Sequence, residues 1–212
     1  FFSLFMLLQQ GAVFSQITKD TTALAAVAVL ASPTKATLQN TAASISVISR
    51  KELDKSDGII LTSVLNKIPG LYMQQGALNT IKISIRGIGS RSQYGTQKIK
   101  GYFEGIPLTT AEGESTIEDI DLETIGSIEI IKGPNSTSFG SGLGGVIHLF
   151  AREIPTDEFQ AKSITTFGSF GLLKQNFSAN YGKSSTMGSV NYSHLQSDGF
   201  RQNSSYDRKS LT

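Results

Sequence analysis

The residues that could do chemistry in this chain are few, and their spacing does not suit catalysis. The 212 residues contain two His, His148 and His194, and no Cys. A chain without Cys has no thiol nucleophile, no disulfide scaffold and no Cys-ligated zinc, and two His cannot build a three-His metal site. We find no nucleophile–base pair, no metal-ligand spacing and no cofactor fingerprint. The sequence therefore predicts a protein that is not an enzyme and that carries no cofactor or metal.

Two glycine-rich matches to nucleotide-binding motifs fail on their context. Residues 140–145 read GSGLGG and fit G-x-G-x-x-G, but a dinucleotide fingerprint opens a helix and this one leads into the strand-like VIHLF. Gly182-Lys183-Ser184 resembles the end of a P-loop, but Phe177 stands where the motif requires Gly. Both matches are interpreted as chance.

Charge is segregated along the chain, although the net charge is only +2. Acidic residues crowd an interval that has no Lys or Arg from 101 to 131: Glu104, Glu112, Glu114, Glu118, Asp119, Asp121, Glu123 and Glu129. Paired carboxylates could serve as acid and base or bind calcium. However, Asp119 to Glu123 lacks the Gly of a calcium loop, and its alternation with Ile and Leu predicts a solvated face over a buried one.

A basic stretch precedes the acidic one. Its cations occur with no acidic residue between Ala77 and Phe103: Lys82, Arg86, Arg91, Lys98 and Lys100. Arg91 and Tyr94 fall in a Gly/Ser loop, where a guanidinium could grip an anionic or polar ligand in a bidentate manner. Nucleic acid would require more positive charge and more aromatic residues, so it is not an expected partner.

The middle of the chain, 43–153, has the pattern of a compact α+β domain. Strands are predicted at 44–48, 81–85, 99–103, 125–131 and 146–150, where apolar residues alternate or run together. Ser49 and Glu52 form a predicted capping box for a short helix. A second helix is predicted from the spacing of apolar residues between Ile60 and Ile68, and Pro69-Gly70 ends it. A Gly-rich turn is predicted at 133–145.

The two ends of the chain have different textures. Residues 1–15 resemble part of a signal peptide with a cleavage site after Ser15, since their apolar run is too short to span a bilayer. Residues 16–42 are predicted to be an extended, mobile segment around the apolar run 24–31. From Phe159, apolar and aromatic residues alternate with polar ones in segments of about ten residues, which is typical of transmembrane β-hairpins. We expect the chain to be a fragment at both ends.

Three blocks of sequence resemble the plug domain of TonB-dependent outer-membrane receptors. They are LTSVLNKIPGLYM at 61–73, ISIRGIGSRS at 83–92 with GYFEGIPL at 101–108, and IGSIEIIKGPNSTSFGSGLGGVIHLFAR at 125–152. The resemblance implies an α+β plug domain, with a small mixed sheet and short helices, at 43–153. It implies that 154–212 begin a transmembrane antiparallel β-barrel in the outer membrane of a Gram-negative bacterium.

The resemblance also implies a mechanism of active import. Ligand binds from outside, TonB pairs with the periplasmic N-terminal segment, and ExbB and ExbD couple TonB to the inner-membrane proton gradient. The run that matches the family's TonB box consists of Leu24, Ala25, Ala26, Val27, Ala28, Val29, Leu30 and Ala31. The expected partners are therefore TonB, a small-molecule metal chelate and outer-membrane lipid.

Individual residues match the family's motifs with some departures. Arg86 matches the Arg of the family's IRG motif, and Lys132 stands at a site that is commonly Arg. Glu129 matches the Glu of the family's IE(V/I) pattern, for which we expect a structural role. In the family the cations face barrel carboxylates and latch the plug, but Lys cannot form the forked pair that Arg forms. Two further departures are Phe139, where Tyr is usual, and Glu104, where Asp is usual.

The ligand contacts implied by the resemblance lie in the apex loops 89–96 and 108–115. They are Arg91, Gln93, Tyr94, Thr109 and Thr110. A ferric siderophore or another iron chelate is the leading ligand. Cobalamin or glycan import, a signal-transducing receptor and a soluble binding module remain the alternatives.

Overall fold

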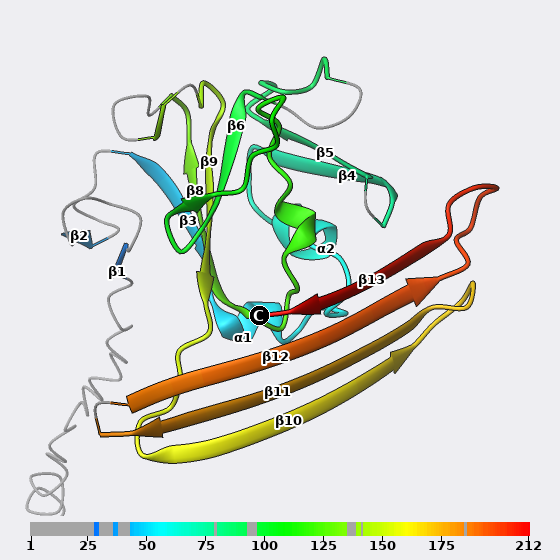
Figure 1. Cartoon of the computed structure of the whole chain (residues 1–212). Helices are drawn as coiled ribbons and strands as arrows, with labels where there is room; N and C mark the ends of the chain where they lie inside the picture. The colour runs from blue at the N-terminus through cyan, green and yellow to red at the C-terminus, as the bar shows by residue number, and fades with distance from the viewer. Residues whose placement is uncertain are drawn as a thin grey trace, which may run out of the picture.

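The structure is a computed structural model that describes most of the chain after residue 42. The described residues are 28–29, 36–37, 43–78, 80–92, 97–134, 139–140, 142–184 and 186–212. We call residues 43–153 the plug region and strands β10 to β13 the barrel sheet. In Figure 1 the barrel sheet runs as a long curved layer along one side of the plug region. Across the described part of the chain, no helix has the length and apolarity needed to cross a membrane.

A five-stranded sheet in the order β3-β8-β9-β6-β7 forms the centre of the plug region. The strands are β3 (Ser44–Ile48), β8 (Ile125–Lys132), β9 (Gly145–Ala151), β6 (Ile99–Phe103) and β7 (Ile106–Pro107). β6 pairs with β9 in parallel, and the other pairs are antiparallel. The sheet is therefore mixed, as the resemblance to the plug domain implied.

Short helices and a hairpin cover one face of this sheet. They are α1 (Arg50–Leu53), α2 (Thr62–Leu65), the 3₁₀ helix η2 (Ile117–Asp119), and the hairpin of β4 (Leu71–Ala77) with β5 (Thr80–Ile85). The predicted capping box is confirmed, because the Ser49 backbone N–H donates to the Glu52 carboxylate at 2.8 Å. The second helix is shorter than predicted, since it excludes Ile60 and Ile68.

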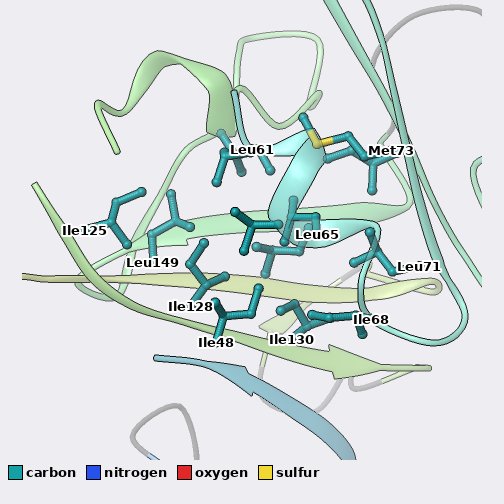
Figure 2. Close-up of a cluster of buried hydrophobic side chains, with 14 of the residues drawn as sticks. Ile48, Leu61, Leu65, Ile68, Leu71, Met73, Ile125, Ile128, Ile130 and Leu149 are labelled. Carbon is teal, nitrogen blue, oxygen red and sulfur yellow. The ribbon is translucent and has the colours of Figure 1, made fainter. Parts of the chain in front are cut away.

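The hydrophobic core lies between this face of the sheet and the covering helices and hairpin. Figure 2 shows side chains from α2, β4, β8 and β9 meeting there, among them Leu65, Met73, Ile128 and Leu149. Leu65, Ile128 and Leu149 have no exposed surface. Burying a side chain of this size contributes about 1.5–3 kcal/mol, so the core alone can hold the short helices in place.

The barrel sheet has the order β10-β11-β12-β13 and is antiparallel throughout. Its strands are β10 (Glu158–Phe167), β11 (Leu173–Lys183), β12 (Thr186–Ser197) and β13 (Tyr206–Leu211). One face exposes apolar and aromatic residues, among them Phe159, Phe177, Tyr181, Val190 and Tyr192. The other face buries polar residues against the plug region, among them Lys174, Asn176, Asn191 and Ser193. This alternation is the pattern of a lipid-facing barrel wall.

The connections in the barrel sheet differ in length at its two ends. Residues 168–172 join β10 to β11 and residues 198–205 join β12 to β13, whereas only 184–185 lie between β11 and β12. In outer-membrane barrels the short turns face the periplasm and the longer loops face outside. We therefore take the end that carries 168–172 and 198–205 as the outer end.

Candidate functional site

Asp121 lies at the contact between the plug region and the barrel sheet. It follows η2, and its carboxylate is buried, with 2% of the side chain exposed. Its Oδ2 atom lies 2.9 Å from Lys174 Nζ of β11, accepts a hydrogen bond from Ser193 Oγ of β12 at 2.7 Å, and lies 3.7 Å from Arg208 of β13. One plug carboxylate therefore contacts three successive barrel strands.

Two further hydrogen bonds connect the same cations to plug backbone. Lys174 Nζ donates to the Gly58 carbonyl oxygen at 2.6 Å, and the Arg208 guanidinium donates to the Glu118 carbonyl oxygen at 2.7 Å. We call Asp121, Lys174, Ser193 and Arg208 the Asp121 cluster. It ties the loop before α2 and the end of η2 to the barrel sheet.

The burial of Asp121 corrects the expectation from sequence. The alternation around it predicted a solvated acidic face, and this prediction is wrong for Asp121, which is 4% exposed. Burial raises the pKa of its carboxyl, but the Lys174 ammonium and the Ser193 hydroxyl outweigh burial, so the pKa lies below its ordinary value. The carboxylate is therefore charged at neutral pH. Its partners lie far away in sequence, so the pattern around Asp121 alone could not reveal the pairing.

Glu118 is a second carboxyl beside this cluster, and its pKa is shifted in the opposite direction. Burial raises its pKa from the ordinary 4.5 to about 7, and the nearby charges of Asp119 and Glu114 add to the rise. Its Oε2 atom and the Arg208 Nε atom are both buried, and neither has a hydrogen-bond partner among the described residues. Glu118 can therefore take up or release a proton near neutral pH.

The residues predicted to latch the plug have other contacts in this structure. Lys132 Nζ donates to Ser46 Oγ at 3.0 Å and to the Pro69 carbonyl at 3.3 Å, and the Arg86 guanidinium donates to the Lys132 carbonyl at 3.5 Å. Glu129 is buried in β8. These contacts of Arg86 and Lys132 lie within the plug region, and a latch to barrel carboxylates stays a prediction.

His148 lies opposite Glu129 in the register of β8 and β9. Its ring stacks on the Tyr102 ring, with the ring centres 4.8 Å apart, and packs edge-on against the Phe139 ring with the same distance between centres. Neither ring nitrogen has a hydrogen-bond partner in the described part of the chain. Burial lowers the pKa of His148 from 6.5 to about 4, so the ring is neutral at pH 7. The structural role expected of a lone His in a strand fits this environment.

The two predicted apex loops are joined at their bases. Gln97 Nε2 donates to the Glu112 carbonyl at 2.6 Å, and Lys100 Nζ donates to the Gly113 carbonyl at 3.0 Å. Arg91, Thr109 and Thr110 are exposed, as ligand contacts would be. Gln93 and Tyr94 lie outside the described residues, as do all of the TonB-box-like residues except Ala28 and Val29.

A cavity of about 390 Å³ lies at the outer end, between the plug region and the barrel sheet. The tip of the β4–β5 hairpin contributes Ala77 and Leu78, and the barrel connections contribute Phe170 and Phe200. The Arg201 guanidinium lies 5.0 Å from the centre of the Phe200 ring. No local sequence pattern indicates this cavity, because its walls come from segments that are distant in sequence. The described residues contain no group of three or more His, Asp or Glu able to hold a metal ion.

A mixed-sheet plug region beside an antiparallel, lipid-facing barrel sheet defines the class of outer-membrane receptors whose barrel is filled by a plug. The family model for the TonB-dependent receptor plug domain matches residues 37–146. The chain belongs to this family, and the protein is located in the outer membrane of a Gram-negative bacterium.

Curated relatives support the assignment. An iron-regulated outer membrane virulence protein of Vibrio cholerae is 37% identical over 121 residues, which cover 55% of this chain and 18% of the relative. The vitamin B12 transporter BtuB of Vibrio vulnificus is 28% identical over 139 residues, which cover 64% of this chain and 22% of the relative. The chain thus spans about a fifth of the length of these relatives.

Solved structures show the same fold. The siderophore receptor PiuA from Acinetobacter baumannii has a TM-score of 0.62 and 21% identity, covering 83% of this chain and 24% of that one. The ferric yersiniabactin uptake receptor FyuA from Yersinia pestis has a TM-score of 0.61 and the same identity, covering 80% of this chain and 27% of that one. The predicted plug domain and barrel start are confirmed.

Proposed function

We propose that the protein is a receptor that imports a ferric siderophore or another iron chelate across the outer membrane and does not catalyse a reaction. Residues 43–153 act as the plug, and 154–212 as the first barrel strands. The observation that carries the proposal is the family match together with the iron-regulated relative from Vibrio cholerae. The names of a ferrioxamine receptor and of several siderophore receptors among the similar proteins agree with it.

Exposed polar residues and an apolar cavity could supply what such a ligand needs. Arg91, Thr109 and Thr110 are exposed on neighbouring loops, and guanidinium and hydroxyl groups suit the anionic and polar groups of an iron chelate. The cavity of about 390 Å³ lies within the size range of small-molecule sites. Its aromatic walls would suit the apolar part of a chelate.

Growth and uptake assays test the ligand. A strain that lacks the gene should lose growth on one or more defined ferric chelates as sole iron source, and radiolabelled iron should no longer enter from that chelate. Arg91→Ala should weaken chelate binding without loss of membrane insertion, while Lys51→Ala, an exposed cation on α1, should leave binding unchanged. Unchanged binding in Arg91→Ala would refute its role.

We further propose that TonB, energised through ExbB and ExbD, drives the import by pairing with 24–31. Deletion of these residues should abolish uptake and leave surface binding of the chelate intact. Uptake that survives the deletion would refute this placement of the TonB box.

Cobalamin is the second candidate ligand, because the relative from Vibrio vulnificus is a vitamin B12 transporter. Growth that depends on the gene with cobalamin as the limiting nutrient, and not with any ferric chelate, would favour this alternative.

A further inference from the structure

The charged contacts between the plug region and the barrel sheet converge on one carboxylate. Asp121 forms ion pairs with Lys174 of β11 and Arg208 of β13 and accepts a hydrogen bond from Ser193 of β12. A second ion pair across the interface joins Glu123 to Lys162 of β10 at 3.3 Å, but 43% of the Lys162 side chain is exposed. The two pairs therefore offer a buried and a solvated example of the same contact.

Burial decides how much each pair matters. The Lys174 side chain is 5% exposed and the Asp121 side chain is 2% exposed, so water reaches neither charge. Removing one partner of such a pair leaves an uncompensated buried charge, which is strongly destabilising. A pair with an exposed partner is screened, and its loss costs little.

The cluster also engages backbone that leads into different parts of the plug region. Lys174 holds the Gly58 carbonyl just before α2, and Arg208 holds the Glu118 carbonyl in η2. Asp121 itself bonds the Glu123 backbone N–H at 2.9 Å, two residues before β8 begins. Displacement of the plug from this wall must break the contacts of Lys174, Ser193 and Arg208 with the plug together, whereas the Asp121–Glu123 hydrogen bond lies within the plug region and moves with it.

We propose that the Asp121 cluster is the anchor that fastens the plug to the first strands of the barrel and sets how readily the plug leaves this wall. Asp121 positions the plug, and Lys174 supplies the charge that its carboxylate needs when water is excluded.

A cysteine reporter in the full-length protein tests the anchor. The 212 residues contain no Cys, so Ser178→Cys in β11 provides a single reporter thiol in a full-length background in which any Cys outside these residues is replaced by Ser. Ser178 lines a cavity of about 60 Å³ between Glu123, Arg152 and the barrel sheet. Ser178 is half-buried against plug residues there, so the thiol should react slowly with a bulky polyethylene-glycol maleimide while the plug is seated and faster when the plug moves away. The labelling rate without ligand therefore measures plug displacement.

Asp121→Asn should raise the labelling rate about a hundredfold, the consequence of leaving Lys174 buried without its counter-charge. Lys174→Met should do the same, and Lys174→Arg, which keeps the charge, should stay within about tenfold of the parent. The double variant Asp121→Asn/Lys174→Met should label more slowly than either single variant, because it leaves neither charge of the pair buried alone.

Lys162→Met is the matched control, since Lys162 also pairs across the interface, with Glu123, but 43% of its side chain is exposed. It should change the labelling rate less than threefold, about 0.6 kcal/mol or less. Heat-modifiable migration on gels confirms that each barrel has folded. Three results would overturn the proposal: a parental labelling rate in Asp121→Asn, an equal acceleration in Lys162→Met, or additive effects in the double variant. If Asp121→Asn loses chelate uptake while its labelling rate stays at the parental value, the anchor is refuted and the proposed import function stands.

Discussion

Two groups of charged plug residues differ in what they contact. The Asp121 cluster is buried and crosses to the barrel sheet, whereas Lys132 and Arg86 contact hydroxyl and carbonyl oxygens inside the plug region. Sequence motifs single out the second group, and the geometry singles out the first. The difference shows that the contribution of a charge to stability depends on its desolvation and on its partner, neither of which a local motif encodes.

The largest effect is expected from Lys174→Met. This substitution removes the cation that lies 2.9 Å from Asp121 and leaves a buried carboxylate without its closest counter-charge. Losing one partner of a buried pair costs about 3–5 kcal/mol. A urea titration of the full-length protein in detergent, followed by a fluorophore on the plug, should show a clear fall in the midpoint. A parental midpoint would mean that water reaches this interface.

Glu118 should give the Asp121 region a pH dependence. Its pKa is about 7 in the folded protein and 4.5 ordinarily, so between these values the folded state binds more protons than the unfolded state. The free energy of unfolding should therefore fall as pH rises from about 4.5 to about 7. Glu118→Gln should remove this slope and stabilise the plug at pH 8 by about 1–2 kcal/mol, after allowance for solvent screening. Parallel pH curves for the two proteins would contradict the prediction.

His148, which lies opposite Glu129 in the central sheet of the plug region, should give a pH dependence of opposite sign. Its pKa is about 4 in the folded protein and 6.5 ordinarily, so the unfolded state binds the proton more readily. Stability should be fully present above pH 6.5 and should be lost as pH falls towards 4. His148→Phe keeps the stacking on Tyr102 and should flatten this acid limb. An unchanged limb would assign the acid sensitivity to another group.

Local patterns in the sequence predicted most of the fold. The alternation of Ile81, Ile83 and Ile85 gave the half-buried strand β5, and Ser49 with Glu52 gave the capped start of α1. β4 was not predicted, because it begins at Leu71 directly after the Pro-Gly stop and its pairing with β5 is a tertiary choice.

The candidate site was less predictable than the fold. Asp121 and Ser193 are 72 positions apart, so their hydrogen bond depends on how the barrel sheet wraps the plug region. One signal was available: Lys174 and Asn176 occupy the alternate positions of β11 that face away from Phe177 and Tyr181, and a cation on the inner face of a barrel strand needs a plug partner. The apex residues could be placed in loops, but their ligand could not be deduced from exposure alone.

The smallest effect is expected from Lys132→Met, the same substitution as at Lys174 in the other region. Lys132 Nζ contacts the Ser46 hydroxyl and the Pro69 carbonyl, and the Pro69 contact is exposed to solvent. Losing such contacts should cost at most about 1 kcal/mol, since water can replace the ammonium at the exposed oxygen. In the urea titration the midpoint of this variant should stay close to that of the parent, while the midpoint of Lys174→Met should fall well below it. A loss as large as that of Lys174→Met would show that Lys132 has a buried partner on barrel strands beyond β13, and the predicted latch would then carry as much of the plug's attachment as the Asp121 cluster does.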